Sequence, residues 1–237
     1  MPKRVTTGRR TKPFGSRTVV RKSRKARPVC PSLLVLECDP AKLAAHSLTS
    51  ARDIHTLVGT LVPSARRYFI PARLRQELLL QLARCAEECS AVDIIVVCGH
   101  SNQAGLQLTS DWFAPWDEVA QWIAPFQPKR VVLVACQGGR WLPSSTLFRG
   151  ISTLQEIFGS PVLLTDQQAL LIKLLVPHLL TNGGLKKDIL QMVQVANFLL
   201  TNGVIFPQTR KGFERSGIED GVLWTAIEDL LKGWLGR

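Results

Sequence analysis

Two residues that could act together as a nucleophile and a base each follow an apolar segment of the sequence. His100 comes after residues 92–98 (VDIIVVC), with Gly99 between them, and Cys136 comes directly after residues 130–135 (RVVLVA). A thiol is mostly protonated at neutral pH, and a neighbouring imidazole can take its proton and later protonate a leaving amine. The two residue types therefore predict a Cys-His catalytic pair, if the fold brings both segments together.

The same chemistry needs donors for the oxyanion that forms when a thiolate attacks a carbonyl. The backbone N–H of Cys136 is one candidate, and an N–H from the turn at Ser101 or Asn102 is the other. Gly138 and Gly139 permit the tight turn that would lift the thiol out of its strand.

Hydrophobic patterning predicts the elements that must position this pair. Continuous apolar runs, typical of buried strands, occupy 32–38, 92–98 and 130–135, with shorter strands expected at 67–70 and 162–165. Helices are predicted at 50–61, 72–89, 116–124, 147–158, 167–181, 186–201 and 221–235, a loop at 141–146, a hairpin arm at 104–109 and an extended piece at 204–209.

Apolar strands that alternate with helices predict an α/β fold, an open and mainly parallel sheet with helices on both faces. In such sheets, sites form where strands end at the carboxyl edge. Residues 99–101 and 136–139 follow two of these strands. The pattern therefore predicts that His100 and Cys136 lie at the same edge of the sheet, where they can face each other if their strands are neighbours.

At these strand ends the sequence resembles caspase-like cysteine peptidases (clan CD). Ala135-Cys136-Gln137-Gly138 matches the core of the caspase nucleophile signature. The run 131–139 (VVLVACQGG), following 92–100, is most similar to the CHAT branch. Two positions differ from the family pattern: Val134 replaces a glutamine, and Ser101 replaces the glycine after the histidine.

The resemblance implies a caspase-like peptidase domain over residues 30–237. It implies a cysteine endopeptidase that acts on a protein or peptide substrate, with His100 and Cys136 catalytic and with backbone oxyanion donors at Ser101 and Cys136. It implies no cofactor and no metal. It further implies a bacterial protease in signalling or defence that a regulatory partner or signal controls.

The primary specificity pocket of this family is built from strand-end loops and often reads a charged side chain. Asp39 and Asp166 are candidates for reading a basic side chain at P1, although Asp39 also suits a turn and Asp166 a helix N-cap. Arg66 or Arg67 could instead read an acidic one. The sequence leaves both choices open.

The net charge of +12 is concentrated at the start of the chain. Residues 1–28 hold 11 of the 30 Lys and Arg residues, which leaves 19 bases against 18 acids in the remainder. Residues 1–29 also lack hydrophobic periodicity, so a disordered basic tail is predicted there. Such a tail is expected to make weak, nonspecific, salt-sensitive contact with nucleic acid through residues 1–28.

The six cysteines form no CxxC pair, and no secretion signal or membrane-spanning run is evident. Free thiols and a cytoplasmic location are therefore expected, with no membrane contact. Two other functions stay open. One is a catalytically inactive caspase-fold module that assembles on a partner or nucleic acid, which the serine at position 101 favours. The other is a Cys-His thioesterase or amidase, although the nucleophile elbow typical of α/β-hydrolases is missing.

Overall fold

A computed structural model describes residues 30–38, 51–72, 74–89, 91–109, 112–161, 163–164, 166–182, 187–199 and 205–215. The predicted tail 1–29, Asp39 and the predicted helix at 221–235 lie outside these described residues.

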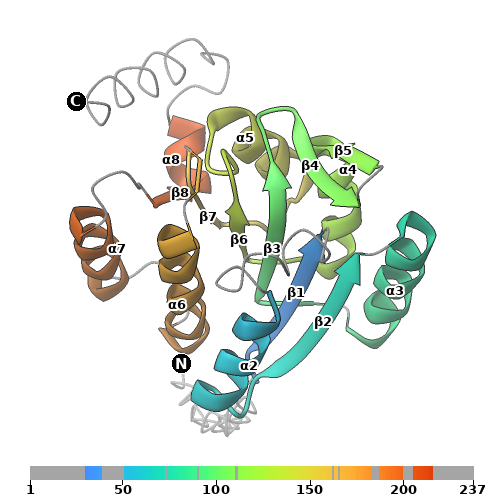
Figure 1. Cartoon of the computed structure of the whole chain (residues 1–237), viewed down its shortest axis with the longest axis horizontal. Coiled ribbons are helices and arrows are strands. Elements are labelled where there is room, and N and C mark those ends of the chain that lie inside the picture. Colours follow the sequence, from blue (N-terminus) through green and yellow to red (C-terminus); the bar gives the residue numbers. More distant parts are fainter. Residues whose placement is uncertain are drawn as a thin grey trace, which may run out of the picture.

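An eight-stranded, mostly parallel sheet forms the centre of the molecule (Figure 1). The main strand order is β2-β1-β3-β6-β7-β8, in which only β8 runs antiparallel to its neighbour. A β4–β5 hairpin extends from β3. The strands are β1 (Ser32–Cys38), β2 (Arg66–Ala72), β3 (Ile94–Ser101), β4 (Gly105–Thr109), β5 (Trp112–Pro115), β6 (Arg130–Ala135), β7 (Glu156–Gly159) and β8 (Phe206–Thr209).

Helices cover both faces of this sheet, as the alternating pattern predicts (Figure 1). The first face packs against α2 (Ala51–Leu61), α6 (Asp166–Asn182) and α7 (Lys187–Leu199). The second face packs against α3 (Arg75–Glu88), α4 (Trp116–Ile123), α5 (Trp141–Gly150) and α8 (Arg210–Arg215), and a 3-10 turn, Ala124–Phe126, follows α4. The predicted α/β class with helices on both faces is confirmed.

Side chains along each central strand alternate between the two faces. On β3, Val96 and Cys98 pack toward α2 and α6, whereas Ile95 and Val97 pack toward α3 and α4. Because both faces are covered, the strands read as continuous apolar runs. Of the helices in the described ranges, none combines the length and hydrophobicity that crossing a membrane requires.

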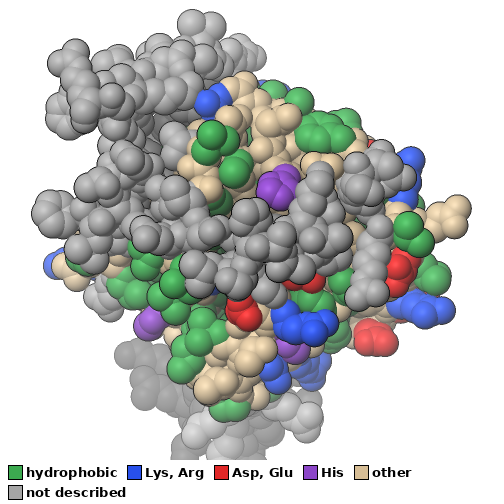
Figure 2. Space-filling view, in the orientation of Figure 1, with side chains coloured by type: hydrophobic (Ala, Val, Ile, Leu, Met, Phe, Trp, Pro, Cys, Tyr) green, Lys and Arg blue, Asp and Glu red, His purple; other side chains and the backbone are tan. Residues whose placement is uncertain are grey.

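On the surface of the described residues, Lys and Arg side chains lie in small groups near Asp and Glu on the face that Figure 2 presents.

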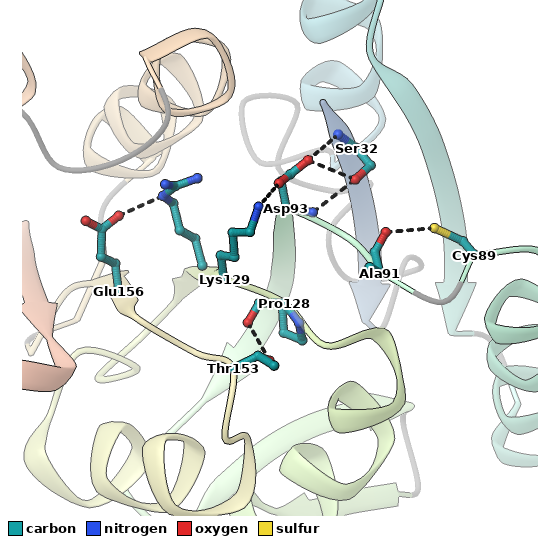
Figure 3. A network of polar contacts seen from close by, with 9 residues as sticks. Ser32, Cys89, Ala91, Asp93, Pro128, Lys129, Thr153 and Glu156 are labelled. Carbon is teal, nitrogen blue, oxygen red and sulfur yellow. Dashed lines mark hydrogen bonds and ion pairs between the residues drawn. The ribbon is translucent and has the colours of Figure 1, made fainter. Parts of the chain in front are cut away.

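A polar network joins the amino ends of three central strands (Figure 3). The Asp93 carboxylate accepts hydrogen bonds from the backbone N–H and the hydroxyl of Ser32 at 3.0 and 3.1 Å, and from Lys129 Nζ at 2.9 Å. Burial alone would raise the pKa of Asp93, but the hydrogen bonds from Lys129 and Ser32 outweigh it and hold the pKa below its ordinary value. The carboxylate therefore ties β1 and β6 to the start of β3.

Residues 141–165 differ from their predicted elements. Helix α5 begins at Trp141, where a loop is expected, and β7 replaces the end of the predicted helix 147–158. Pro143 is tolerated because the first-turn amides of a helix have no intrahelical partner. The strand predicted at 162–165 is wrong for Leu163 and Leu164, which lie outside any strand.

The cause lies in contacts far along the chain. Arg210 donates hydrogen bonds to the carbonyl oxygens of Phe148, Ile151 and Leu154 at 2.6–2.7 Å. It thereby provides donors for carbonyl groups at the end of α5 that have no partner within the helix. Strand β7 is then held between β6 and β8. The predicted extended piece at 204–209 contains β8, whereas β5 and α8 have no counterpart in the prediction.

Candidate active site

His100 and Cys136 lie at neighbouring positions on the carboxyl edge of the sheet. The parallel register of β3 and β6 pairs Gly99 with Ala135, and each candidate residue is the next one in its chain. Paired strands lie about 5 Å apart, so the backbones at His100 and Cys136 lie side by side. By strand alternation, residues 100 and 136 continue the face that carries Cys98 and Val134.

A tight turn carries Cys136 away from β6. The Gly138 N–H donates to the Ala135 carbonyl at 3.3 Å, and the Arg140 N–H donates to the Gln137 carbonyl at 3.1 Å. The left-handed position in this turn is Gln137, with φ of 58°, so neither glycine is needed for the positive φ.

Gly139 instead allows a close approach to the end of β7. A Cβ atom at this position would lie 2.6 Å from the backbone carbon and oxygen of Gly159. The Gly139 N–H donates to the Ser160 carbonyl at 2.9 Å, and Gln208 Nε2 donates to the Gly139 carbonyl at 2.5 Å. The turn that carries Cys136 is therefore held against the ends of β7 and β8.

Ser101 connects β3 to the turn that carries Cys136. Its hydroxyl donates a hydrogen bond to the backbone carbonyl of Cys136. The N–H of Asn102 donates to the Gly105 carbonyl at 3.0 Å within the hairpin. Because successive amides of a strand point to opposite sides, the Ser101 N–H is directed away from β4 and toward β6. Of the two turn amides that the sequence leaves open, this geometry favours Ser101.

The end of β3 is held on several sides. His100 pairs with Gln107 of β4, and the Trp116 indole N–H donates to the Asn102 carbonyl at 3.1 Å. A Cβ at Gly99 would lie 2.8 Å from Cys38 Cβ, so β1 packs tightly against β3 here. The backbone that presents His100 is therefore part of the sheet.

The thiols of the described chain differ in their surroundings. Burial raises the pKa of Cys98 to about 12, although the nearby Lys173 ammonium opposes this shift. Burial, followed by the neighbouring Cys89, raises the pKa of Cys85 to about 11. Both thiols stay protonated near neutral pH. Cys136 is only half-buried, and its Sγ accepts a hydrogen bond from the Leu164 N–H at 3.4 Å.

The residues predicted to read the P1 side chain differ in where they lie relative to the candidate site. Asp39 lies outside the described residues, and Asp166 is the first residue of α6, two positions after Leu164, with its side chain outside the description. Arg66 and Arg67 begin β2, where Arg66 pairs with Ser32 at the opposite edge of the sheet. A rise of about 3.3 Å per residue separates them from the carboxyl edge by roughly 15–20 Å. The structure therefore does not bring these arginines to the site.

Sequence reasoning missed three groups near this edge. Glu37 is buried near the carboxyl end of β1, where its Oε1 accepts the Ala51 N–H at 3.1 Å and so caps α2. The Leu164 amide contacts the thiol, and Gln107 lies beside His100. A lone acid in an apolar strand was a readable signal for Glu37, whereas the other two depend on the fold.

In the described part of the chain, no group of three or more His, Cys, Asp and Glu side chains is placed to hold a metal ion. No protein-family model matches the chain, and no curated protein matches it either.

Proposed function

We propose that this chain is a cysteine endopeptidase of the caspase-like class, closest to the CHAT branch. The observation that carries the proposal is the register of β3 and β6, in which His100 and Cys136 each follow the pair Gly99 and Ala135. The short Ala-Cys-Gln-Gly match supports the same conclusion from the sequence.

In the proposed reaction, His100 takes the thiol proton and Cys136 Sγ attacks the scissile carbonyl carbon. The oxyanion accepts hydrogen bonds from the backbone N–H groups of Cys136 and Ser101. As the C–N bond breaks, His100 gives its proton to the leaving amine. Water then hydrolyses the thioester, which releases the acid and restores the thiol.

Substrate preference is part of the proposal. Asp39 and Asp166 are kept as candidates for reading a basic P1 side chain, while Arg66 and Arg67 are set aside because they begin β2 at the far edge. Control by a regulatory partner, a cytoplasmic location and weak nucleic-acid contact through residues 1–28 stay predictions from the sequence.

A labelling experiment tests the proposal. Peptide-based thiol-reactive probes with Arg, Lys or Asp at P1 are incubated with the wild type, Cys136→Ala, His100→Ala and Cys30→Ala. We expect labelling of Cys136 that depends on the P1 residue and falls by about 10²–10⁴-fold in His100→Ala. Cys30 is exposed, so Cys30→Ala controls for ordinary thiol reactivity. Equal labelling of all accessible thiols, without P1 preference, would contradict the proposal.

One observation favours a second candidate, an inactive interaction module of the same fold. The Leu164 amide donates to Cys136 Sγ, so the chain's own segment engages the thiol. Such a module predicts no P1-dependent labelling and no change in partner binding for Cys136→Ala. The same probes and variants therefore distinguish the two functions.

A further inference from the structure

Three strands carry one row of residues that extends from the candidate site. His100 on β3 pairs with Gln107 on β4, and Gln107 pairs with Phe113 on β5. Cys136 lies beyond the end of β6, on the other side of His100. Directly paired residues of an antiparallel sheet share a face, with Cβ atoms about 5 Å apart. Phe113 therefore lies about 10 Å from His100, on the side opposite Cys136.

Phe113 lies on the outer face of the β4–β5 hairpin, because the residues next to it in the strands are buried on the inner face. Leu106, Leu108 and Ala114 of the hairpin belong to the core beneath it. Strand alternation then turns Gln107 and Phe113 outward, and Phe113 is 45% exposed. The Phe113 ring is thus an apolar surface that the core does not use.

Gly105 lets the ring lie close to the hairpin backbone. A Cβ at this position would meet Phe113 Cε1 at 2.7 Å and the Ala114 carbonyl oxygen at 2.1 Å. A glycine is therefore required where the ring rests on β4. This contact places the aromatic ring against the β4 backbone, in the row that begins at His100.

The proposed chemistry indicates which half of a bound peptide substrate would lie over this row of residues. In thiol acyl transfer, the acyl half of the substrate stays on the cysteine, while the leaving half takes its proton from the histidine. Since Phe113 lies on the far side of His100 from Cys136, it faces the leaving half. An extended peptide advances about 3.3 Å per residue, so about 10 Å corresponds to the second or third residue after the scissile bond.

We propose that Phe113 forms an apolar subsite that selects a hydrophobic side chain two or three residues after the scissile bond of a peptide substrate. Gln107 lies between this subsite and His100 in the row of paired residues. This inference rests on the proposed peptidase function and adds a specificity-determining residue to it.

Cleavage of a peptide library derived from a proteome tests the subsite. Mass spectrometry of the new amino termini reads the residues that follow each cut, for the wild type, Phe113→Ser, Phe113→Leu and Leu80→Ser. Leu80 is an exposed leucine on α3 and serves as the matched control for losing surface hydrophobicity. Cys136→Ala defines the background, and thermal melting checks that each variant folds.

We expect hydrophobic residues to be enriched at the second or third position with the wild type, Leu80→Ser and Phe113→Leu. Phe113→Ser should lose about ten-fold of that preference, which is the size of effect that a small apolar pocket gives. Cleavage with no such enrichment, or with enrichment unchanged in Phe113→Ser, overturns the subsite and leaves the peptidase function standing. Absence of any cleavage that depends on Cys136 overturns both.

Discussion

The hydroxyl of Ser101 donates a hydrogen bond to the backbone carbonyl of Cys136, so the end of the histidine strand holds the turn that carries the thiol. A glycine at this position, as the caspase-like pattern has it, could not make this contact. The departure from the pattern therefore has a structural consequence at the candidate site.

Ser101→Ala should destabilise the protein, because the partly buried Cys136 carbonyl loses its side-chain donor. We expect a loss of about 1 kcal/mol, or a fall of roughly 2–4 °C in Tm, measured by thermal unfolding. Ser144→Ala is the matched control, since the Ser144 hydroxyl is buried and has no hydrogen-bond partner among the described residues. An equal loss in both variants would show that the Ser101 contact contributes nothing.

Thiol alkylation at pH 8 should follow the surroundings of each cysteine. We expect Cys30 and Cys136 to react first, because Cys30 is exposed and Cys136 is half-buried. Cys98 and Cys85, whose pKa values are raised to about 12 and 11, should react only after unfolding. Mass spectrometry of timed digests measures the order. Modification of Cys98 as fast as Cys136 in the native state would contradict it.

Gly139→Ala should unfold or displace the turn that carries Cys136, since the new Cβ would lie 2.6 Å from the backbone of Gly159. Overpacking against backbone that cannot move typically costs about 1–3 kcal/mol, which denaturant unfolding measures. Labelling of Cys136 should fall as well.

Gly59→Ala is the contrasting variant. The nearest atoms that a Cβ there would meet belong to the guanidinium of Arg67, an exposed side chain that can turn away at the loss of its exposed hydrogen bond to the His55 carbonyl. Alanine also suits a helix interior better than glycine, so we expect little or no loss of stability. Comparable damage from both substitutions would argue against the tight contact at Gly159.

The Asp93 network should make stability depend on pH at the acidic end. The pKa of Asp93 is lowered from 3.8 in the folded state, so its contribution is present above about pH 4 and is lost as the pH falls through the folded pKa. At pH 7, Asp93→Asn should cost about 1–2 kcal/mol in urea unfolding. This difference from the wild type should shrink at pH 3.

Lys129→Met provides the second arm of that experiment. It removes the ammonium at 2.9 Å from the Asp93 carboxylate and should raise the pKa of Asp93. Acid unfolding should then begin at a higher pH than in the wild type. An unchanged acid transition in both variants would mean that Asp93 does not control it.

Much of the central sheet could be predicted from local patterns. Residues 32–38 and 130–135 form strands with the predicted bounds, because both faces are buried and the sequence there is almost continuously apolar. The rule that parallel strands share their carboxyl ends also placed His100 and Cys136 at one edge of the predicted sheet. That their strands are neighbours was only a condition in the sequence, and the pairing of β3 with β6 meets it.

Long-range contacts decided the segments that local patterns assigned wrongly. Arg210, which follows α5 by about 60 residues, donates hydrogen bonds to carbonyl groups at and after the end of that helix. Strand β8 pairs with the outer side of β7. The secondary-structure propensity of residues 141–158 does not reflect either contact, because both come from residues outside that segment. The loop predicted at 141–146 and the end of the helix predicted at 147–158 were therefore wrong, whereas residues 147–150 are helical as predicted. The physical reason is that tertiary contacts outweigh weak local preference.

The sequence by itself determined the residue types of the candidate pair and the strands that present them. Only the tertiary structure decided that the Asn102 N–H donates within the hairpin and that the Ser101 hydroxyl donates to the Cys136 carbonyl. It also decided that Arg66 lies at the end of the sheet opposite the candidate site. Composition and periodicity predict which segments are buried, because burial depends on the local pattern of apolar residues. Register and turn geometry determine which groups face one another, and these depend on strands that are distant in sequence.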